Sequence, residues 1–470
     1  MISLPLSEVA ELAGGRLADV SDPSVRVFGP VVTDSRRVGP GGLFVALPGE
    51  RADGHDYARG AVDAGAVAVL AARPVGVPAV VMGEGRDVLD GLAGLARGVV
   101  DRLPRTVVTA VTGSSGKTTT KDLLAQVLGR GGPTIAPEGS YNNEIGHPLT
   151  VLRADATTRH LVLEVSARGV GHIAHLCRIA PPTLGIVLNV GTAHMGEFGS
   201  RAMIAKAKGE LVEALPPDGV AILNADDPFV REMAVRTAAR TSTYGLAGEA
   251  AGEVDVRATD VELDAMTRPR FTLVTPEGAR PVRLGLHGRH NVANALAAAA
   301  AARALGMTVG EVADALNDAV ARSPWRMEVR GSPAGITVVN DAYNANPDSV
   351  RAALDALVSM ARDGRTWAVL GEMAELGDEA AAEHAAVGRE AVRRGVSRLV
   401  VVGEEAAAIA EGAREAGAGP ERVARVPDAE AATAMVCAQV RAGDIVLVKG
   451  SRVVGLELVA AGLLGGAVHA

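Results

Sequence analysis

One stretch restricts the fold of this chain more than any other. A β-branched run at 106–112 leads into a glycine- and serine-rich loop at 113–119 and then into a helical pattern over 118–128. An apolar run bounded by glycine is typical of a buried strand. Between such a strand and a helix, backbone N–H groups point toward phosphate oxygens, Lys117 can reach the terminal phosphates, and the Thr118 hydroxyl can ligate Mg²⁺. The stretch therefore predicts a phosphate site on a parallel α/β sheet.

The loop departs from the general phosphate-loop pattern at one position, because Val111 stands where that pattern has its first glycine. The shorter T-G-S-S-G-K-T-T form remains. Strand, turn, lysine and helix together favour phosphate binding over a turn without a ligand. The residues that we expect to bind the phosphates are Gly113, Ser114, Ser115, Gly116, Lys117, Thr118 and Thr119.

Alternating strand and helix patterns divide the 470 residues into three segments. Segment 1–105 has expected strands at 31–33, 43–46 and 67–70 and a helix at 57–64. Segment 106–323 adds strands at 161–165 and 184–190, an antiparallel patch at 253–286, and helices at 291–305 and 309–321. Segment 324–470 holds the apolar runs TWAVLGEM, RLVVVGEE and DIVLVKGS among helices at 349–362, 380–394 and 429–441, the last with Asp428 as its N-cap.

These patterns predict an α/β protein of three domains. The N-terminal domain is a small α/β unit, the central domain has a mainly parallel sheet around the phosphate loop, and the C-terminal domain is a Rossmann-like, doubly wound unit.

Composition excludes several other classes of function. The net charge is −8 and aromatic residues make up 2%, so no face for nucleic acid is expected. Cys177 and Cys437 are too few for a disulfide framework or a cysteine-rich zinc site, and we expect two buried thiols. The N-terminus lacks the pattern of a signal peptide, and no run approaches the roughly 18 apolar residues of a membrane helix. We therefore expect a cytoplasmic protein without membrane insertion.

Polar residues stand where apolar runs end, which is where open α/β sheets bind ligands. Glu164 ends one run and suits Mg²⁺, and His194 follows another at a place from which it can reach a metal or a phosphate. The amides of Asn142 and Asn143 can bridge phosphate oxygens or orient a substrate carboxylate. Each has a plainer explanation: a solvated acid, a packing histidine or a solvent turn.

Other candidates follow the same logic. Lys206 and Lys208 open an expected helix, where solvated lysines are the plain alternative. Asn291 and Asn294 project from one face of the first turn of another helix, and an N-cap explains only one of them. The third segment adds polar residues at its boundary and after its strands: Arg326, Asp341, Tyr343, Asn344, Asn346, Lys449, Ser451 and Arg452.

The order of these motifs resembles the Mur ligase family over nearly the whole chain. Thr33-Asp34-Ser35-Arg36, GGLFVALPG and Asp53-Gly54-His55 resemble its uridine-nucleotide-binding domain, and T-G-S-S-G-K-T-T resembles its form of the phosphate loop. TAHMGEFGS, AKAKGEL, GRHNVANALAAAA and VKGSR are further family strings. YNANPDS and LGEMAELGDEA resemble the members that add D-alanyl-D-alanine to UDP-N-acetylmuramoyl-tripeptide.

The resemblance implies an ATP-dependent ligase that forms an amide bond in peptidoglycan synthesis. The substrate carboxylate takes the γ-phosphoryl group of ATP, and an amine attacks the resulting acyl phosphate. This chemistry requires in-line positioning and neutralisation of two anions, and closure of the third domain would exclude water. The implied partners are ATP, two Mg²⁺ ions, UDP-MurNAc-tripeptide and D-Ala-D-Ala. We expect a monomer and no nucleic acid.

The resemblance also implies a role for each candidate. Lys117, Glu164, His194 and Lys208 are the expected catalytic residues. Thr118, Glu164 and His194 would ligate Mg²⁺, together with Lys208 as a carbamate, since carbamylation turns this cation into an anion. The nucleotide would contact Asn291, Asn294, Arg326 and Asp341. The expected substrate-binding residues are Ser35, Arg36, Asn142, Asn143, Tyr343, Asn344, Asn346, Lys449, Ser451 and Arg452.

Two positions depart from the resemblance. Glu164-Val165-Ser166 is closer to the sister ligase that adds diaminopimelate or lysine, and Trp325 stands where the family has glycine. The sister's Asp-Asn-Pro-Arg string does not occur in this chain. Folylpolyglutamate synthase is disfavoured by the N-terminal segment, and a phosphotransferase or switch-type NTPase leaves the third segment unexplained. A dead scaffold would lack Lys117, Glu164 or His194, and all three are present.

Overall fold

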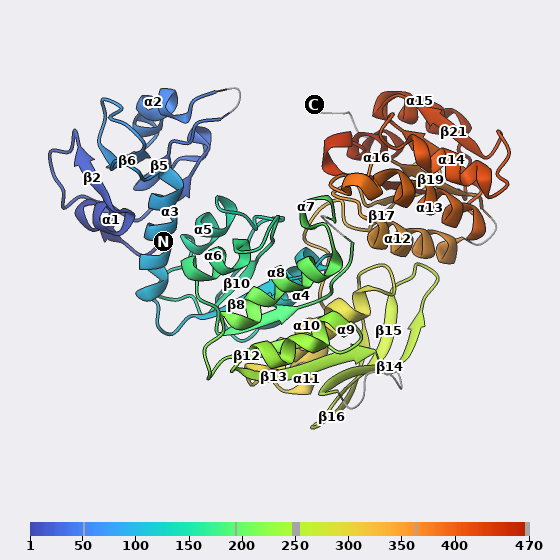
Figure 1. Ribbon diagram of the computed structural model, residues 1–470, viewed down its shortest axis with the longest axis horizontal. Helices are drawn as coiled ribbons and strands as arrows, with labels where there is room; N and C mark the ends of the chain where they lie inside the picture. The colour runs from blue at the N-terminus through green and yellow to red at the C-terminus, as the bar shows by residue number, and fades with distance from the viewer. Residues whose placement is uncertain (50–51, 193–194, 247–253, 362–363, 466–470) are drawn as a thin grey trace.

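Three sheets form three bodies along the chain. The computed structural model describes residues 1–49, 52–192, 195–246, 254–361 and 364–465. Figure 1 shows the N-terminal part in blue at one end, the central part in green and yellow, and the C-terminal part in red at the other end. Each body has its own sheet with helices packed on it, so the predicted α/β class is confirmed.

The N-terminal sheet has five strands in the order β2-β7-β6-β5-β4, of which only β2 is antiparallel to its neighbour. Its strands are β2 (Gly15–Ala18), β4 (Val31–Val32), β5 (Gly42–Val45), β6 (Ala66–Ala71) and β7 (Ala79–Met82), beside a small pair β1 (Leu4–Pro5) and β3 (Arg26–Val27). Its helices are α1 (Leu6–Ala13), α2 (Ala58–Asp63) and α3 (Val88–Asp101), with the 3₁₀ turns η1 (Ser35–Arg37) and η2 (Gly54–Tyr57). Helix α3 also packs on the central body.

The central sheet has nine strands in the order β16-β15-β14-β13-β12-β11-β8-β10-β9. They are β8 (Val107–Thr112), β9 (Thr134–Ile135), β10 (His160–Glu164), β11 (Leu184–Val187), β12 (Val220–Asn224), β13 (Arg240–Leu246), β14 (Val256–Leu263), β15 (Pro269–Thr275) and β16 (Gly278–Arg283). All neighbours are parallel except β14–β15 and β15–β16, which confirms the predicted antiparallel patch.

The central helices cover this sheet. They are α4 (Lys117–Leu128), α5 (Gly146–Val151), α6 (His172–Ile179), α7 (Met195–Phe198), α8 (Arg201–Glu213), α9 (Pro228–Arg231), η3 (Glu232–Arg236), α10 (Asn291–Ala304) and α11 (Val309–Asn317). Most alanines of α10 are buried, at 295 and 297–302, and this helix packs directly on α4. Small side chains permit that close approach, which brings the start of α10 beside the phosphate loop.

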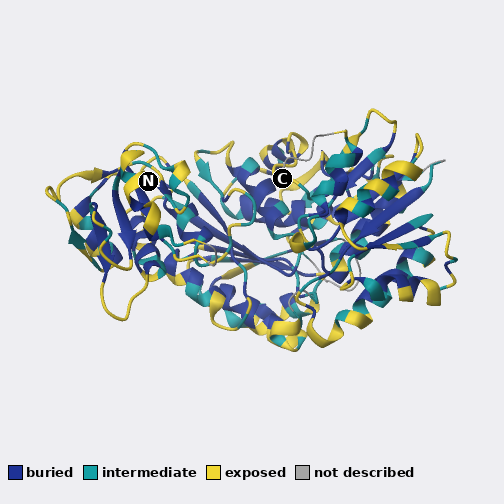
Figure 2. Ribbon diagram, turned by 90° about the horizontal axis from the view of Figure 1, so that it is seen from above, coloured by how far each residue is buried: buried dark blue, intermediate teal, exposed yellow. Residues whose placement is uncertain are grey.

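The C-terminal sheet has the order β17-β18-β22-β19-β20-β21, parallel except for β17. Its strands are β17 (Glu328–Gly331), β18 (Thr337–Asn340), β19 (Thr366–Leu370), β20 (Arg398–Val402), β21 (Val423–Val426) and β22 (Ile445–Lys449). Its helices are α12 (Pro347–Met360), η4 (Gly377–Glu379), α13 (Ala380–Arg393), α14 (Ala407–Glu415), α15 (Ala429–Gln439), η5 (Arg452–Val454) and α16 (Glu457–Leu463). Apolar cores lie on both faces of the sheet, as the doubly wound prediction requires. Figure 2 shows these buried sheets between helices with exposed outer faces.

Several local predictions can be compared with the structure. Asp428 caps α15 through the Ala431 N–H at 2.8 Å, as predicted. Asn291 is not an N-cap, because His290 holds that position and Asn291 is already helical. Cys177 is buried, but the prediction of a buried thiol is wrong for Cys437, which is exposed. None of the helices in the described part of the chain is long and apolar enough to cross a membrane.

Candidate active site

The phosphate loop lies between β8 and α4, as the sequence predicts. Gly116 has φ of 81°, a left-handed conformation that favours glycine. A Cβ on Gly116 would lie 2.4 Å from Asn294 Oδ1, so close packing excludes a side chain as well. Lys117 Nζ donates a hydrogen bond of 2.8 Å to the Gly113 carbonyl. Burial lowers the pKa of Lys117, the Glu164 carboxylate opposes this, and Arg326 adds to it.

Glu164 is the last residue of β10, the strand beside β8, and its side chain is buried. Its two oxygens accept hydrogen bonds from Thr118 Oγ1 at 2.8 Å and from Asn142 Nδ2 at 2.7 Å. Three predicted residues therefore meet at one carboxylate, and the plain explanation of a solvated acid is wrong. A hydroxyl and a carboxylate are the hard oxygen ligands that Mg²⁺ prefers, so this pair fits one such ion.

The structure does not supply a complete metal cage in the part that it describes. No group of three or more histidine, cysteine, aspartate or glutamate side chains there is placed to hold a metal. Mg²⁺ commonly takes its remaining ligands from water and substrate phosphates, so the Thr118–Glu164 pair remains compatible with it. His194, the predicted ligand of a second ion, lies outside the described residues.

Lys208 lies in α8 and is 4% exposed, whereas Lys206 is exposed. Among the residues with described positions, no hydrogen bond or ion pair engages the Lys208 amine. Burial lowers the pKa of Lys208 well below its ordinary value, and the nearby Lys117 lowers it further. The plain explanation of a solvated lysine is therefore wrong for Lys208 and holds for Lys206.

Asn291 and Asn294 are both buried and form a chain behind the phosphate loop. Asn294 Oδ1 accepts from Thr120 Oγ1 at 3.3 Å, and Asn294 Nδ2 donates to Asn291 Oδ1 at 2.8 Å. Asn291 Nδ2 in turn donates to the His287 carbonyl at 2.7 Å. The expected shared face is confirmed, and it ties the start of α10 to α4.

Ser140 links the two larger bodies, and the sequence analysis did not identify it. Its hydroxyl lies 2.8 Å from Thr118 Oγ1 and accepts a hydrogen bond of 2.6 Å from Arg326 Nη2. The Arg326 guanidinium also stacks on Tyr343, with 4.2 Å between its Cζ and the ring centroid. Arg326, which lies at the predicted domain boundary, therefore reaches the phosphate loop. A serine inside a polar loop carries no pattern that would have revealed this.

In the C-terminal body, Lys449 and Asp341 pair with each other at the ends of the neighbouring strands β22 and β18. Lys449 Nζ lies 2.6 Å from Asp341 Oδ2 and donates to the Asn344 carbonyl at 2.9 Å. Lys449 is 2% exposed, so its charge is satisfied within the body. The predicted convergence of strand-end residues is present.

The remaining substrate candidates divide into two groups. Asn143 and Asn346 cap local backbone, accepting N–H groups at the start of α5 and of α12, and Ser451 Oγ accepts the Ala374 N–H at 2.9 Å. Arg452 is half exposed, forms an ion pair with Glu457 and stacks on Trp325 at 4.4 Å. Arg452 is the one cation of this set, and its guanidinium is open to solvent.

Ser35 and Arg36 lie in η1 of the N-terminal body. Arg36 pairs with Asp34 at 2.8 Å and is largely exposed. Arg37 lies 3.9 Å from Glu138, an ion pair that places η1 beside the loop carrying Ser140 and Asn142. Segments from all three bodies therefore contact the loop at 138–142.

The central and C-terminal bodies also meet through backbone. The Gly196 N–H in α7 donates to the Glu375 carbonyl at 3.2 Å, just before η4 with Gly377. The Thr192 N–H lies 3.4 Å from an Asp348 oxygen at the start of α12. The segment that contains MAELGD, residues 373–378, thus forms part of the interface between these bodies.

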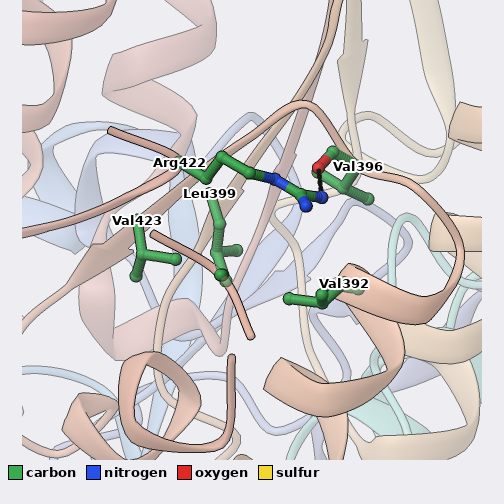
Figure 3. A pocket seen from close by; sticks show the side chains of 7 residues that line it. Val392, Val396, Leu399, Arg422 and Val423 are labelled. Atoms are coloured by element: carbon green, nitrogen blue, oxygen red, sulfur yellow. Dashed lines mark hydrogen bonds between the residues drawn. The ribbon is translucent and has the colours of Figure 1, made fainter. Parts of the chain in front are cut away.

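Two crevices lie away from this site. Figure 3 shows one between α13, β20 and β21, where Arg422 donates to the Val396 carbonyl at 2.8 Å among apolar side chains. It leaves no room for a water molecule and holds none of the predicted catalytic residues. An open groove of about 660 Å³ lies at the end of α4 opposite the phosphate loop. Neither carries the chemistry described above.

The site therefore combines a phosphate loop, a buried carboxylate–hydroxyl pair, two neighbouring lysines and an arginine from the next body. Such a set can bind a nucleoside triphosphate and stabilise charge on a transferring phosphoryl group.

Comparison with known proteins finds matches over nearly the whole chain. Residues 30–89 match the description "Mur ligase family, catalytic domain", residues 111–302 "Mur ligase middle domain", and residues 325–452 "Mur ligase, glutamate ligase domain". A UDP-N-acetylmuramoyl-tripeptide–D-alanyl-D-alanine ligase of Mycobacterium tuberculosis is 50% identical, over 99% of this chain and 98% of that protein.

Solved structures agree with this relationship. MurF from Acinetobacter baumannii superimposes with a TM-score of 0.87 at 31% identity, covering 98% of this chain and 99% of that one. MurF ligase from Thermotoga maritima in complex with ADP gives a TM-score of 0.79 at 31% identity, covering 93% and 98%. With its fold and its sequence shared over nearly the full length, this chain belongs to the Mur ligase family.

Proposed function

We propose that this chain ligates D-alanyl-D-alanine to UDP-N-acetylmuramoyl-tripeptide, with ATP converted to ADP and phosphate. The observation that carries the proposal is the meeting of Lys117, Thr118, Glu164 and Lys208 at one phosphate loop, in a chain 50% identical to a ligase of that name. The product is the UDP-MurNAc-pentapeptide used in peptidoglycan synthesis.

The three bodies divide the work. We infer that 1–105 binds the UDP-MurNAc-peptide, 106–323 binds ATP, and 324–470 closes on ATP and binds the dipeptide. The Arg37–Glu138 ion pair and the Arg326–Ser140 hydrogen bond support this assignment, because they bring the outer bodies to one loop of the central body. A site assembled from separate bodies can exclude water when it closes, which protects an acyl phosphate from hydrolysis.

The phosphoryl transfer needs positive charge where the γ-phosphoryl group leaves ATP. The loop N–H groups and Lys117 supply it from the central body, and Arg326 supplies it from the C-terminal body. Thr118 and Glu164 would hold a Mg²⁺ ion, which neutralises phosphate charge when bound. Asn142 keeps the Glu164 carboxylate oriented, since its amide donates to one oxygen and leaves the other to Thr118.

The second step needs a neutral amine and an acyl phosphate held in line. The amine of D-Ala-D-Ala attacks the carbonyl carbon, the C–N bond forms, phosphate leaves with the electrons of the C–O bond, and the nitrogen gives one proton to the departing phosphate. Of the C-terminal candidates, Arg452 has a guanidinium edge free to bind the distant carboxylate of the dipeptide. Lys449 is already paired with Asp341 and serves to hold that strand end.

Lys208 supports the finer proposal of a carbamate. Its amine is buried beside Lys117, and the lowered pKa favours the neutral form, which is the form that adds CO₂. The resulting anion would offset the charge of Lys117 and would supply an oxygen ligand for a second Mg²⁺ ion, for which His194 is the other expected ligand. We further propose that the chain acts as a monomer in the cytoplasm.

ADP release across a small matrix of substrates tests the proposal. We expect release with UDP-MurNAc-tripeptide and D-Ala-D-Ala together, and background release when either is omitted. Free diaminopimelate, lysine or glutamate should not replace the dipeptide. Efficient ligation of diaminopimelate to UDP-MurNAc-dipeptide would instead establish the sister activity suggested by Glu164-Val165-Ser166.

A further inference from the structure

Asn189 is the second residue after β11, the strand beside β8, and its side chain is hydrogen-bonded to the phosphate loop. Its Oδ1 accepts the backbone N–H groups of Ser114 and Ser115 at 3.0 and 2.9 Å, and its Nδ2 donates to the Ser115 carbonyl at 3.2 Å. We propose that Asn189 is a positioning residue for ATP. It holds this part of the loop so that the N–H groups from Gly116 onward converge on the phosphates. This inference rests on the proposed ATP-dependent function.

The segment that carries Asn189 is itself fixed on both sides. Asn224, at the end of the next strand β12, donates from Nδ2 to the Leu188 carbonyl at 2.8 Å. The Gly191 N–H donates to Ser114 Oγ at 2.9 Å, which adds a second tie between this segment and the loop. The parallel pairing of β11 with β8 and the Gly191–Ser114 hydrogen bond fix Asn189 against the loop, so it can hold the loop in one conformation before nucleotide arrives, while the Asn224 contact adds stability to the strand end.

The choice of a carboxamide has an electrostatic reason. Consecutive N–H groups that point the same way repel one another, and an oxygen between them stabilises the arrangement. A carboxylate at position 189 would accept the same two hydrogen bonds but would repel the triphosphate. Asparagine accepts both N–H groups without a net charge, and its own N–H also satisfies the Ser115 carbonyl.

A competing role for Asn189 predicts the opposite effect on affinity. If its oxygen merely occupied the place of a phosphate until ATP displaced it, removal of the side chain would tighten nucleotide binding. If the side chain positions the loop, its removal weakens binding. The sign of the change in ADP affinity therefore separates the two roles.

The experiment compares Asn189→Ala with the matched control Asn224→Ala in the full-length protein. Isothermal calorimetry with ADP and Mg²⁺ measures affinity, and thermal unfolding measures the cost to the fold. We expect Asn189→Ala to raise the Kd for ADP roughly tenfold or more, since the three side-chain hydrogen bonds to the loop are lost. Asn224→Ala should lower the Tm but keep the ADP Kd within about threefold, because it contacts the segment and not the loop.

Two further measurements distinguish positioning from general loosening. Amide hydrogen exchange over residues 113–117 should become faster in Asn189→Ala. It should stay near the wild-type rate in Asn189→Asp, which keeps the acceptor, although ADP binding weakens there through charge repulsion. In steady-state ligation, the KM for ATP should rise in Asn189→Ala while the KM for UDP-MurNAc-tripeptide stays unchanged.

An unchanged or tighter ADP Kd in Asn189→Ala would overturn the inference, as would an equal loss of affinity in Asn224→Ala. Should Asn189→Ala fail to fold, Asn189→Ser takes its place with the same expected and contrary outcomes. Binding of ADP is measured without ligation, so the two proposals can fail separately. A protein that binds ADP in an Asn189-dependent way but does not ligate D-Ala-D-Ala would refute only the proposed function.

Discussion

The Thr118 hydroxyl and the Glu164 carboxylate lie 2.8 Å apart, on the first turn of α4 and at the end of β10. This contact joins the phosphate loop to the strand beside it, and it places a hard oxygen pair where a triphosphate would arrive.

Changing Glu164 to Gln should show whether ligation depends on the negative charge of this side chain or only on its shape. The glutamine fills the same space, but its NH₂ group must face a donor from Thr118 or Asn142, and the negative charge is lost. We expect ligation to fall by about 10² or more, with the Mg²⁺ dependence shifted to higher concentration. Thr118→Ser, which keeps the hydroxyl, is the control and should retain most activity. Equal losses in the two variants would contradict the assignment.

Lys117→Ala should abolish ligation while the fold persists. An electrostatic contact to a transferring phosphoryl group contributes about 3–4 kcal/mol, which is a factor of about 10²–10³ in rate. Lys206→Ala serves as the control, because that lysine is exposed. ADP release measures ligation, and circular dichroism measures whether the fold persists. Residual activity above about a tenth of the wild-type rate would refute the role of Lys117.

Lys208 should carry a carbamate, so activity should respond to bicarbonate. Lys208→Ala should be inactive and partly rescued by a short carboxylate such as acetate, which restores the missing anion. Carbon-13 NMR of protein equilibrated with labelled bicarbonate should show a carbamate signal that is absent in Lys208→Ala. Full activity of Lys208→Arg would show that the position needs only a cation.

Arg452→Ala should raise the KM for D-Ala-D-Ala by about tenfold and leave the KM for ATP nearly unchanged. The substitution removes a guanidinium that Glu457 and Trp325 orient, and the carboxylate of the dipeptide loses its partner while ATP does not. Arg389→Ala removes an ion pair with Glu415 in the same body and is the control. If both KM values rise together in Arg452→Ala, the side chain acts on closure of the body instead.

The two cysteines should differ in reactivity. Burial, with Glu210 adding to it, raises the pKa of the Cys177 thiol to about 12, so only about one molecule in 10⁴ is a thiolate at pH 8. Cys437 is exposed. We expect Ellman's reagent to titrate one thiol in the native protein and two after denaturation. Rapid native reaction of both would place Cys177 outside the core.

The parts of the site that follow from strand order were predictable. Glu164 and the phosphate loop stand at the same edge of a parallel sheet, and a strand–loop–helix pattern with a carboxylate at the next strand end brings them together. The alanine helix was likewise predictable, and an N-cap explains neither of its asparagines, since His290 holds that position.

Contacts between distant segments could not be predicted in the same way. The Arg326–Ser140 hydrogen bond spans 186 positions and depends on how two bodies dock. The Asn189 contacts depend on which strand neighbours β8, and an asparagine at a strand end has many plainer explanations. Strand β21 and helix α14 were missed because both are short, and a strand of four residues carries little periodic signal.

Trp325 shows how a departure from the family pattern acquires a physical meaning. Its φ is 58°, in the left-handed region where glycine is favoured, and glycine is what the resemblance led us to expect there. The tryptophan tolerates this backbone while its ring stacks on Arg452. The unusual residue therefore costs backbone strain and supports the arginine that we assign to the dipeptide.

The backbone contact between Gly196 and Gly377 leaves no room for a side chain where the central and C-terminal bodies meet. A Cβ on Gly196 would lie 2.6 Å from the Gly377 nitrogen, and a Cβ on Gly377 would lie 2.5 Å from the Gly196 Cα. No rotamer can relieve such an overlap, because the atoms in the way belong to the main chain on both sides. A single methyl group here would push the two bodies apart, so the distance between them is set by direct contact of their main chains.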